Sequence, residues 1–343
     1  MRLTVTDRST LFSVLAEASR APSAHNTQPA RWRFEPDGTV HLFEDLTRRL
    51  PVADPTGHDG AIGLGAAFEG LHLALSRRGI RLLPLAPSEA SADAMVPESI
   101  PPALRLVGCS SLVSTKGPDP LARFALERRT FRGRFLPTDP QALKGLDKLL
   151  RRSSRVVPLF ARPDIEAIAT LHDRCSAAFL RRPDYRGELC DWLRLTPRDP
   201  RWARDGLTAD CLGLPRPAGP LAAALFRLPI FTVLQKLHLA PLLTMERAQT
   251  RSAAALLVVT AEKAEDPFET GRWFYRLWLD LCRTGLSACP MSALTDSALG
   301  NAYVRERCDV PLSQRIVNVL RVGKAPSRAS VRSPRIPLAE LLV

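Results

Sequence analysis

Directly after an expected helix over residues 7–19, the chain reads Arg20-Ala21-Pro22-Ser23-Ala24-His25-Asn26-Thr27-Gln28-Pro29. Proline stops a helix and restricts the residue before it, so we expect the polar side chains between the two prolines to be held at a helix exit. Asn26 and Gln28 each carry a hydrogen-bond donor and an acceptor. They would suit a flat heterocycle whose edge alternates N–H and C=O groups. An ordinary helix–turn–strand connection is the alternative.

The segments around this motif alternate between predicted strands and helices. Residues 31–34 and 40–43 flank Glu35-Pro36-Asp37-Gly38, which predicts a hairpin. A helix is expected over residues 57–78, where the glycines and alanines of residues 63–67 would allow another helix to approach closely. Further strands are expected at residues 82–85, 104–109, 254–261 and 315–322, and further helices after residue 119 and at residues 140–152, 163–182 and 270–284.

Two segments lack a helical or strand period. Residues 86–102 are rich in proline, serine, alanine and acidic residues, so we expect a surface loop there. Residues 183–220 hold many proline, arginine and glycine residues. A segment of that length and irregularity is usually a lid, a binding loop or a disordered region.

Composition indicates a globular chain that can bury a sizeable core. Its 343 residues are 45% hydrophobic and 24% charged. No run of about 18 apolar residues marks a transmembrane helix, and no signal-peptide pattern is evident. We therefore expect a cytoplasmic protein with no membrane partner.

The net charge of +13 favours an anionic binding partner. Aromatic residues make up only 6% of the chain, and no zinc-finger or RNA-binding motif appears. Nucleic-acid binding is therefore a minor alternative. The seven cysteines include no Cys-x-x-Cys pair and the six histidines no paired helical spacing, so we predict neither a metal site nor a disulfide framework.

Three further segments could bind a ligand. Arg128-Arg129-Thr130-Phe131-Arg132 offers guanidinium groups and a hydroxyl that could bind a phosphate, or it is a solvated basic turn. Cys289-Pro290-Met291-Ser292 follows a helix that we expect Gly285 to end, so its backbone N–H groups could face a ligand, or it is a plain loop. Near the C-terminus, Arg335 could complete a phosphate clamp.

The familiar signatures of other chemistries are absent. The chain has no Gly-x-Gly-x-x-Gly, no Walker loop and no Gly-x-Ser-x-Gly elbow. No nucleophile or metal for hydrolysis is evident, so we expect the chemistry to reside on a bound cofactor, with no catalytic side chain assigned.

In this order, the motifs resemble the nitroreductase-like flavoprotein superfamily, and more closely its fused branch, the Acg family of FMN-binding proteins. The resemblance rests on Ala21–Pro29, Leu50–Gly57, Ile62–Ala67, Arg128–Thr130 and Val319–Gly323. It implies an α+β fold with a mixed, mainly antiparallel sheet flanked by helices. The two halves of the chain would form an intramolecular pseudo-dimer.

The resemblance also implies one FMN site between the halves. The phosphate would lie on Arg128, Arg129, Thr130 and Arg132, with Arg335 as the C-terminal phosphate contact. The remaining cofactor-binding residues implied by the resemblance are Ser23, Asn26 and Gln28 near the ring, and Pro290, Met291 and Ser292 near the flavin N5.

Departures from the family pattern shape the expected organisation. The motif usually continues Gln-Pro-Trp, whereas this chain has Ala30 after Pro29 and Trp32 two positions later. Each half lacks the other half's motif, which predicts one flavin per chain. The expected halves are residues 1–115 and 116–343, with residues 183–240 as a lid or insert, and the chain would be a monomeric pseudo-dimer or a homodimer.

Two functions follow from the resemblance. The first is an FMN-dependent oxidoreductase that passes electrons to a small acceptor of the nitro or quinone type, with NAD(P)H as the candidate electron donor. The second is a flavin-sequestering protein whose closed lid denies NAD(P)H access and leaves little turnover.

Overall fold

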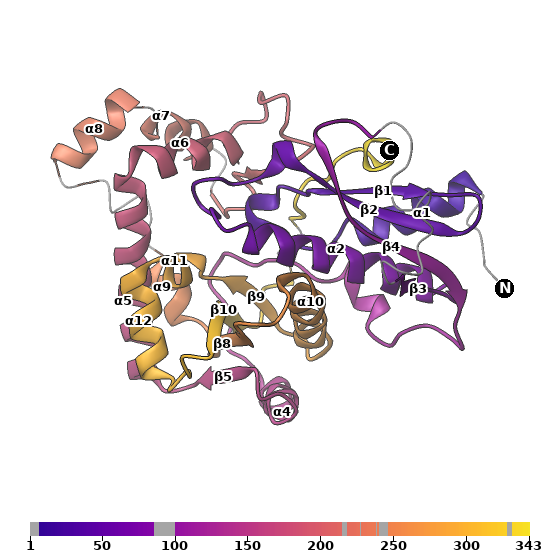
Figure 1. Ribbon diagram of the computed structural model, residues 1–343. Helices are drawn as coiled ribbons and strands as arrows, with labels where there is room; N and C mark the ends of the chain where they lie inside the picture. The colour runs from indigo at the N-terminus through magenta and orange to yellow at the C-terminus, as the bar shows by residue number, and fades with distance from the viewer. Residues whose placement is uncertain are drawn as a thin grey trace.

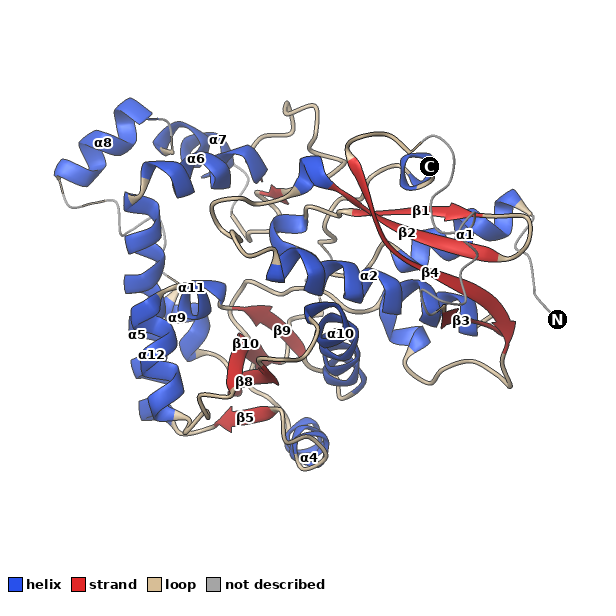
Figure 2. Ribbon diagram, in the orientation of Figure 1, coloured by secondary structure: helices blue, strands red, loops and turns tan. Residues whose placement is uncertain are grey.

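Two four-stranded antiparallel sheets form the centre of the protein, and helices cover them (Figures 1 and 2). The computed structural model describes residues 7–85, 100–214, 218–226, 228–237, 239, 246–327 and 331–343. The expected α+β fold, with antiparallel pairing and flanking helices, is confirmed. Residues 86–99 of the expected surface loop lie outside the described residues.

The first sheet has the strand order β1-β2-β4-β3. Its elements are α1 (Arg8–Ala18), the 3-10 turn η1 (Ala24–Asn26), β1 (Ala30–Phe34), β2 (Thr39–Asp45), the 3-10 turn η2 (Leu46–Arg48), α2 (His58–Ser76), β3 (Ile80–Pro84) and β4 (Leu104–Ser114). The predicted hairpin is β1–β2, where the Thr39 N–H donates to the Asp37 carboxylate at 2.8 Å and Gly38 has φ 87°. A carboxylate that binds the backbone two residues on is a typical turn device.

The second sheet repeats this order as β5-β8-β10-β9. Its elements are η3 (Ala122–Leu126), α4 (Pro140–Leu150), β5 (Val156–Leu159), β8 (Ala255–Glu262), α10 (Pro267–Arg283), β9 (Ser287–Pro290), α11 (Ser292–Asp296), α12 (Ala298–Arg307) and β10 (Gln314–Gly323). In both sheets two neighbouring strands are followed by a long helix and then by the other two strands. The two halves therefore share one topology, although their sequences show no obvious identity.

The halves differ in how the first two strands are joined. A four-residue turn joins β1 to β2, whereas residues 160–254 join β5 to β8. That insert carries α5 (Arg162–Arg181), α6 (Pro183–Trp192), β6 (Leu193–Arg194), β7 (Leu207–Thr208), α7 (Ala218–Leu225), α8 (Leu228–Lys236) and α9 (Arg247–Arg251). The expectation of an irregular segment over residues 183–220 is therefore wrong for α6, β6, β7 and the start of α7. Helix α6 begins at Pro183, and proline is common at the first position of a helix.

Helices α2 and α10, one from each half, pack against each other between the sheets (Figure 1). A Cβ on Gly65 would lie 1.9 Å from the Phe268 carbonyl oxygen, and one on Gly271 would lie 2.1 Å from that of Ile62. The predicted close approach at residues 63–67 is thus confirmed. It depends on a glycine from each helix.

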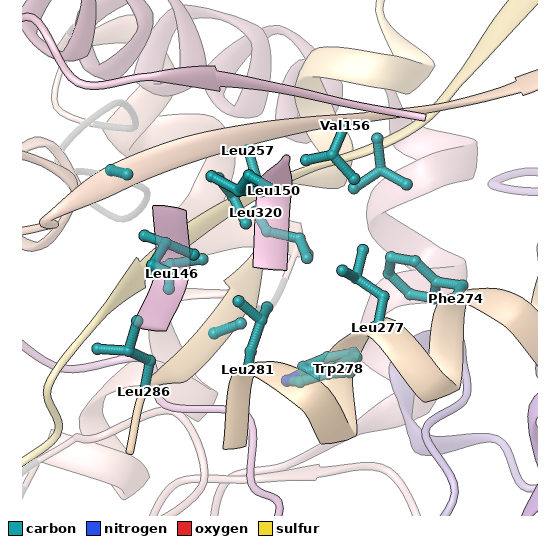
Figure 3. Packing of buried hydrophobic residues seen from close by; sticks show 14 of the residues in the cluster. Leu146, Leu150, Val156, Leu257, Phe274, Leu277, Trp278, Leu281, Leu286 and Leu320 are labelled. Carbon is teal, nitrogen blue, oxygen red and sulfur yellow. The ribbon is translucent and has the colours of Figure 1, made fainter. Parts of the chain in front are cut away.

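Helix α10 also covers the second sheet. Figure 3 shows its apolar side chains gathered with those of α4 and the strands. The labelled members of this cluster are Leu146, Leu150, Val156, Leu257, Phe274, Leu277, Trp278, Leu281, Leu286 and Leu320.

The C-terminal segment returns to the first sheet. The Val343 N–H donates to the Trp32 carbonyl at 3.0 Å, and Leu342 bridges Trp32 in parallel. The 3-10 turn η5 (Leu338–Leu341) precedes this contact. The chain thus crosses from the second sheet back to β1. The boundary expected near residue 115 stays a prediction.

Substitution of Gly65 by alanine is expected to destabilise the protein by about 1–3 kcal/mol or more, because the added methyl overlaps the backbone of α10. The matched control is Gly187→Ala in α6, where nothing lies within 4 Å of the new Cβ. There the change should stabilise by about 0.5–1 kcal/mol. Chemical denaturation measures both, and equal effects would contradict the packing described.

Candidate functional site

A cavity of about 250 Å³ is lined by arginines from three parts of the chain. We call it the arginine cavity. The lining arginines are Arg20 after α1, Arg128, Arg129 and Arg132 before α4, and Arg332 and Arg335 near the C-terminus. Thr130 also lines it, so all four predicted phosphate residues of the 128–132 segment and Arg335 meet in one place.

Arg128 is the most buried of these cations, with 8% of its surface exposed. Its Nη2 donates to the Arg20 carbonyl at 2.8 Å, and its guanidinium lies 4.7 Å from the Trp278 ring centroid. Its Nε and Nη1 are buried without a hydrogen-bond partner among the described residues. Burial lowers the pKa of Arg128, which reflects the cost of holding this charge away from water.

Arg335 reaches the same place from the C-terminal segment. It donates to the Asn26 side-chain oxygen at 2.9 Å, to the Arg20 carbonyl at 3.3 Å and to the Ser19 carbonyl. Burial, together with the charges of Arg128 and Arg20, lowers the pKa of Arg335 to about 9. These groups repel one another unless a counter-charge is present.

Within the described part of the chain, Arg20, Arg128 and Arg335 form no ion pair with a carboxylate. Buried charges are ordinarily paired. Three converging guanidinium groups without an acid therefore indicate a site for an anion, and their planar forks match phosphate geometry.

A second cavity of about 330 Å³ shares Thr130 and Arg132 with the first. We call it the adjoining cavity. Its walls combine the first half, the second sheet and the insert, and its lining includes Pro22, Ser23, Ala24, His25, Asp59, Ile62, Gly63, His172, Ser176, Tyr185, Leu207, Leu212, Phe274, Trp278, Cys289, Pro290, Ser292, Asp296 and Asn318. Apolar walls with a few polar groups are typical of a small-molecule site.

The turn over residues 22–28 is unusual in its backbone. His25, Asn26 and Gln28 have φ of 46°, 57° and 53°, values that non-glycine residues rarely adopt. The Gln28 N–H donates to the Ser23 hydroxyl at 2.9 Å, which closes the turn. Such strained backbone clusters at functional sites.

The strained turn holds His25 in the wall of the adjoining cavity. Its Nδ1 is buried and has no partner among the described residues. Burial, together with the charge of Arg132, lowers the pKa of His25 to about 4, so the imidazole is neutral at pH 7. The predicted cofactor-binding residues do not include His25 or Arg20, although both stand in the quoted motif.

Asn26 and Gln28 line neither of these cavities. The Asn26 amide donates to the carbonyls of Gly206 and Pro334, each at 3.1 Å. Gln28 donates to the Arg204 carbonyl at 3.0 Å and accepts from the Ile336 N–H at 3.1 Å. These amides therefore hold the insert and the C-terminal segment in place. Their predicted contact with a ring stays a prediction.

The predicted 290–292 segment divides between cavity and core. Pro290 and Ser292 line the adjoining cavity, and the Asn318 amide donates to the Ser292 hydroxyl at 3.2 Å. Met291 is fully buried and belongs to the hydrophobic core beneath, while its N–H donates to the Val319 carbonyl at 2.8 Å. Of these three residues, only Pro290 and Ser292 face the cavity.

Part of the insert, residues 204–213, closes both cavities on one side and is firmly tethered. Leu207 and Leu212 line the adjoining cavity, and Cys211 lines the arginine cavity. Asp205 pairs with the fully buried Arg194 at 2.7 Å and with Arg48 of the first half at 3.1 Å. Together with the Asn26 and Gln28 bonds, these contacts make residues 204–213 a fixed wall.

Acidic side chains lie where the adjoining cavity meets a further cleft. Asp59 and Asp296 line both the cavity and this cleft. Burial, reinforced by Asp54, raises the pKa of Asp59 to about 6. Burial, together with the negative charges of Asp296 and Glu188, raises the pKa of the neighbouring Tyr185 hydroxyl to about 12. Across the described residues, no three potential metal ligands of the His, Cys, Asp and Glu types gather.

Three proteins of Mycobacterium tuberculosis have sequences similar to this chain. One, an uncharacterized protein, is 27% identical over 337 residues, which cover 95% of this chain and 90% of the relative. Two others, named as proposed NAD(P)H nitroreductases, are 42% identical over 67 residues and 40% identical over 73 residues, about a fifth of each chain. The resemblance to nitroreductase-like proteins is confirmed over these segments. No family model matches the chain.

Among solved structures, an FMN-dependent nitroreductase of Mycobacterium smegmatis in complex with NADPH is 17% identical, with a TM-score of 0.36, and the match covers 64% of this chain and 94% of that one. An iodotyrosine deiodinase bound to FMN and 3-iodo-L-tyrosine is 16% identical, with a TM-score of 0.35, and the match covers 63% and 94%.

Inorganic phosphate is expected to raise the Tm of the protein relative to sodium chloride of equal ionic strength, because a bound anion offsets the charge of the arginine cavity. At a concentration well above Kd the gain should be at least about 2 °C. Arg128→Ala should lose most of this gain. Equal Tm values in the two salts, or an undiminished gain in the variant, would refute an anion site.

The raised pKa of Asp59 predicts that this residue lowers the stability of the folded protein at neutral pH but not at acid pH. The ordinary pKa of an aspartate is 3.8, and the pKa of Asp59 in the folded state is about 6. At pH values between these two, the folded state binds more protons than the unfolded state. The free energy of unfolding therefore falls as pH rises through that window. Asp59→Asn should raise Tm at pH 7.5 and lose this advantage towards pH 4. A difference that does not change with pH would show that the carboxyl is unperturbed.

Proposed function

We propose that the chain is a flavin oxidoreductase that holds one FMN between its two halves, phosphate in the arginine cavity and ring in the adjoining cavity. The unpaired arginines Arg20, Arg128 and Arg335 are the observation that carries the proposal. Thr130 and Arg132, which line both cavities, would connect the two ends of the cofactor. The chain would work as a monomeric pseudo-dimer, since its two halves share one topology.

The residues present fit this cofactor. The buried, unpartnered nitrogens of Arg128 and Arg20 provide donors for a phosphate, and Trp278 and Pro290 provide flat apolar walls for a ring. Ser23 and the neutral His25 offer polar contacts from the first half. When bound, FMN supplies two-electron chemistry that needs no protein nucleophile.

The protein would bind and orient the cofactor and shield it from water. Arg132 is held by its backbone, because its carbonyl accepts from the fully buried Arg321 at 2.8 Å. The fixed wall, residues 204–213, keeps water from one side. At Asp59 and Asp296 the adjoining cavity meets a further cleft, and this end would admit a reductant of the NAD(P)H type and a small acceptor of the nitro or quinone type.

A flavin-sequestering protein is the second candidate, and the fixed wall is the observation that favours it. Residues 204–213 are held by buried ion pairs and by the motif amides, so this side does not open readily. If the remaining opening is too small for a nicotinamide ring, bound flavin would turn over slowly.

Anaerobic addition of NADPH to the purified, flavin-loaded protein separates the two functions. An oxidoreductase is expected to lose its flavin absorbance within seconds, because hydride transfer bleaches the oxidised ring. Persistent yellow colour with NADPH and with NADH would favour sequestration. Protein that is colourless and fails to bind added FMN would overturn both functions.

Arg128→Ala is expected to weaken FMN binding by roughly 10- to 150-fold, because a hydrogen bond to a charged group contributes about 1.5–3 kcal/mol. The matched control is Arg134→Ala in the same segment, since Arg134 is exposed and lines neither cavity. Fluorescence titration measures both dissociation constants. Equal values for wild type and the Arg128 variant would reject the phosphate assignment.

A further inference from the structure

Cys211 places a thiol in the wall of the arginine cavity. Its backbone N–H donates to the Thr208 hydroxyl at 3.2 Å, and its carbonyl accepts from Arg132 at 3.4 Å. Its Sγ lies 3.8 Å from the hydroxyl of Ser333, which also lines the cavity. The residue is half-buried and its thiol is free of any disulfide. The backbone contacts therefore hold an accessible thiol in one place.

The surroundings of this thiol are cationic. Among the described lining residues of the cavity there are six arginines and one carboxylate, Asp210, which is exposed. Arg335 lies close enough to Cys211 for their charges to interact. Burial and neighbouring arginines lower the pKa of Arg335, whereas negative charge on Cys211 acts in the opposite direction. Reactive cysteines typically occupy partly exposed, electropositive surroundings of this kind.

Arg128 shows independently that this cavity calls for a negatively charged ligand. It is 8% exposed, and its Nε and Nη1 have no hydrogen-bond partner among the described residues. Both Arg128 and Cys211 line the same cavity. A buried charged donor requires a partner. An anion formed on the sulfur of Cys211 would therefore lie within reach of a site that is built for anions.

We propose that Cys211 is a peroxide-sensitive thiol whose oxidised form occupies the arginine cavity in place of an external anion. Its sulfur attacks a hydroperoxide: an S–O bond forms, the O–O bond breaks, and the departing oxygen takes the thiol proton and leaves as water or an alcohol. Sulfur loses two electrons and the peroxide gains them. A second equivalent of peroxide converts the sulfenic acid in the same way to sulfinic acid, which loses its proton to give a sulfinate.

The sulfinate suits the arginines. It carries one negative charge and two acceptor oxygens, which match the paired donors of a guanidinium group as a carboxylate does. Once formed, it competes with phosphate groups for the same donors. If the proposed function holds, oxidation of Cys211 lowers the affinity for FMN, and bound FMN protects the thiol; the oxidation itself depends only on the arginine cavity.

Mass spectrometry of the flavin-free full chain after treatment with hydrogen peroxide tests the reactivity. Cys211 should be oxidised at least about tenfold faster than Cys282, because the thiolate is the form that reacts and burial raises the pKa of the Cys282 thiol to about 11. Cys190 is half-buried as Cys211 is, and burial raises its pKa, so it should react slowly as well. Oxidation of Cys211 no faster than these two controls would overturn the proposal.

A bound anion is expected to protect Cys211. Saturating sodium phosphate should slow its oxidation several-fold relative to sodium chloride of equal ionic strength, whereas Cys190 and Cys282 should react equally fast in both salts. Saturating FMN should protect Cys211 in the same way. Protection by phosphate but not by FMN would support the placement of Cys211 and reject the flavin assignment. Protection by neither would refute the placement of Cys211 in an anion site.

Two variants of equal size isolate the effect of charge. Cys211→Asp imitates the sulfinate, and Cys211→Asn differs from it only in carrying no charge. The charged variant should have the higher Tm in sodium chloride and gain less from phosphate, because its carboxylate pairs with the arginines. It should also bind FMN at least about tenfold more weakly, which corresponds to one charge-assisted hydrogen bond. Equal Tm values and equal gains from phosphate in the two variants would contradict the proposal, and this measurement needs no flavin.

Discussion

The unpaired charge of Arg128 is the constraint on which the site depends. A buried guanidinium with two unpartnered nitrogens costs free energy that the protein does not recover from a carboxylate of its own. Arg335 and Arg20 add further positive charge to the same cavity. An anion bound in this cavity would supply the missing negative charge and stabilise the arrangement.

The fold brings these charges together from distant parts of the sequence. Two sheets of the same strand order meet through α2 and α10, and the close contact at Gly65 and Gly271 fixes how the halves sit. Arg128 and Arg335 both donate to the carbonyl of Arg20, so one peptide group of the first half positions two cations from elsewhere. An anion bound there would hold the two halves together.

The insert adds what the repeated topology lacks. In the first half a four-residue turn joins the paired strands, whereas in the second half residues 160–254 take its place. That segment supplies one wall of both cavities. Residues 204–213 line one side of the site, and Asp59 and Asp296 line both the adjoining cavity and the cleft beside it.

Sequence patterns predicted the local elements and the arginine cluster well. The hairpin, the long helices and the convergence of Arg128 with Arg335 follow from periodicity, turn residues and resemblance. Side-chain direction was harder: the positive φ angles at Asn26 and Gln28 turn their amides towards Gly206 and Ile336, and no sequence period encodes that reversal. Likewise, Met291 sits in the core between two cavity residues, because the chain turns there from β9 into α11.

Comparison of FMN with riboflavin tests the central claim most directly, since the two ligands share a ring and differ only in the phosphate. Fluorescence titration of the apoprotein should give a dissociation constant for FMN roughly 10- to 150-fold lower than that for riboflavin, from one or more charge-assisted hydrogen bonds. Equal constants for the two ligands would contradict the claim that the arginine cavity holds the flavin phosphate.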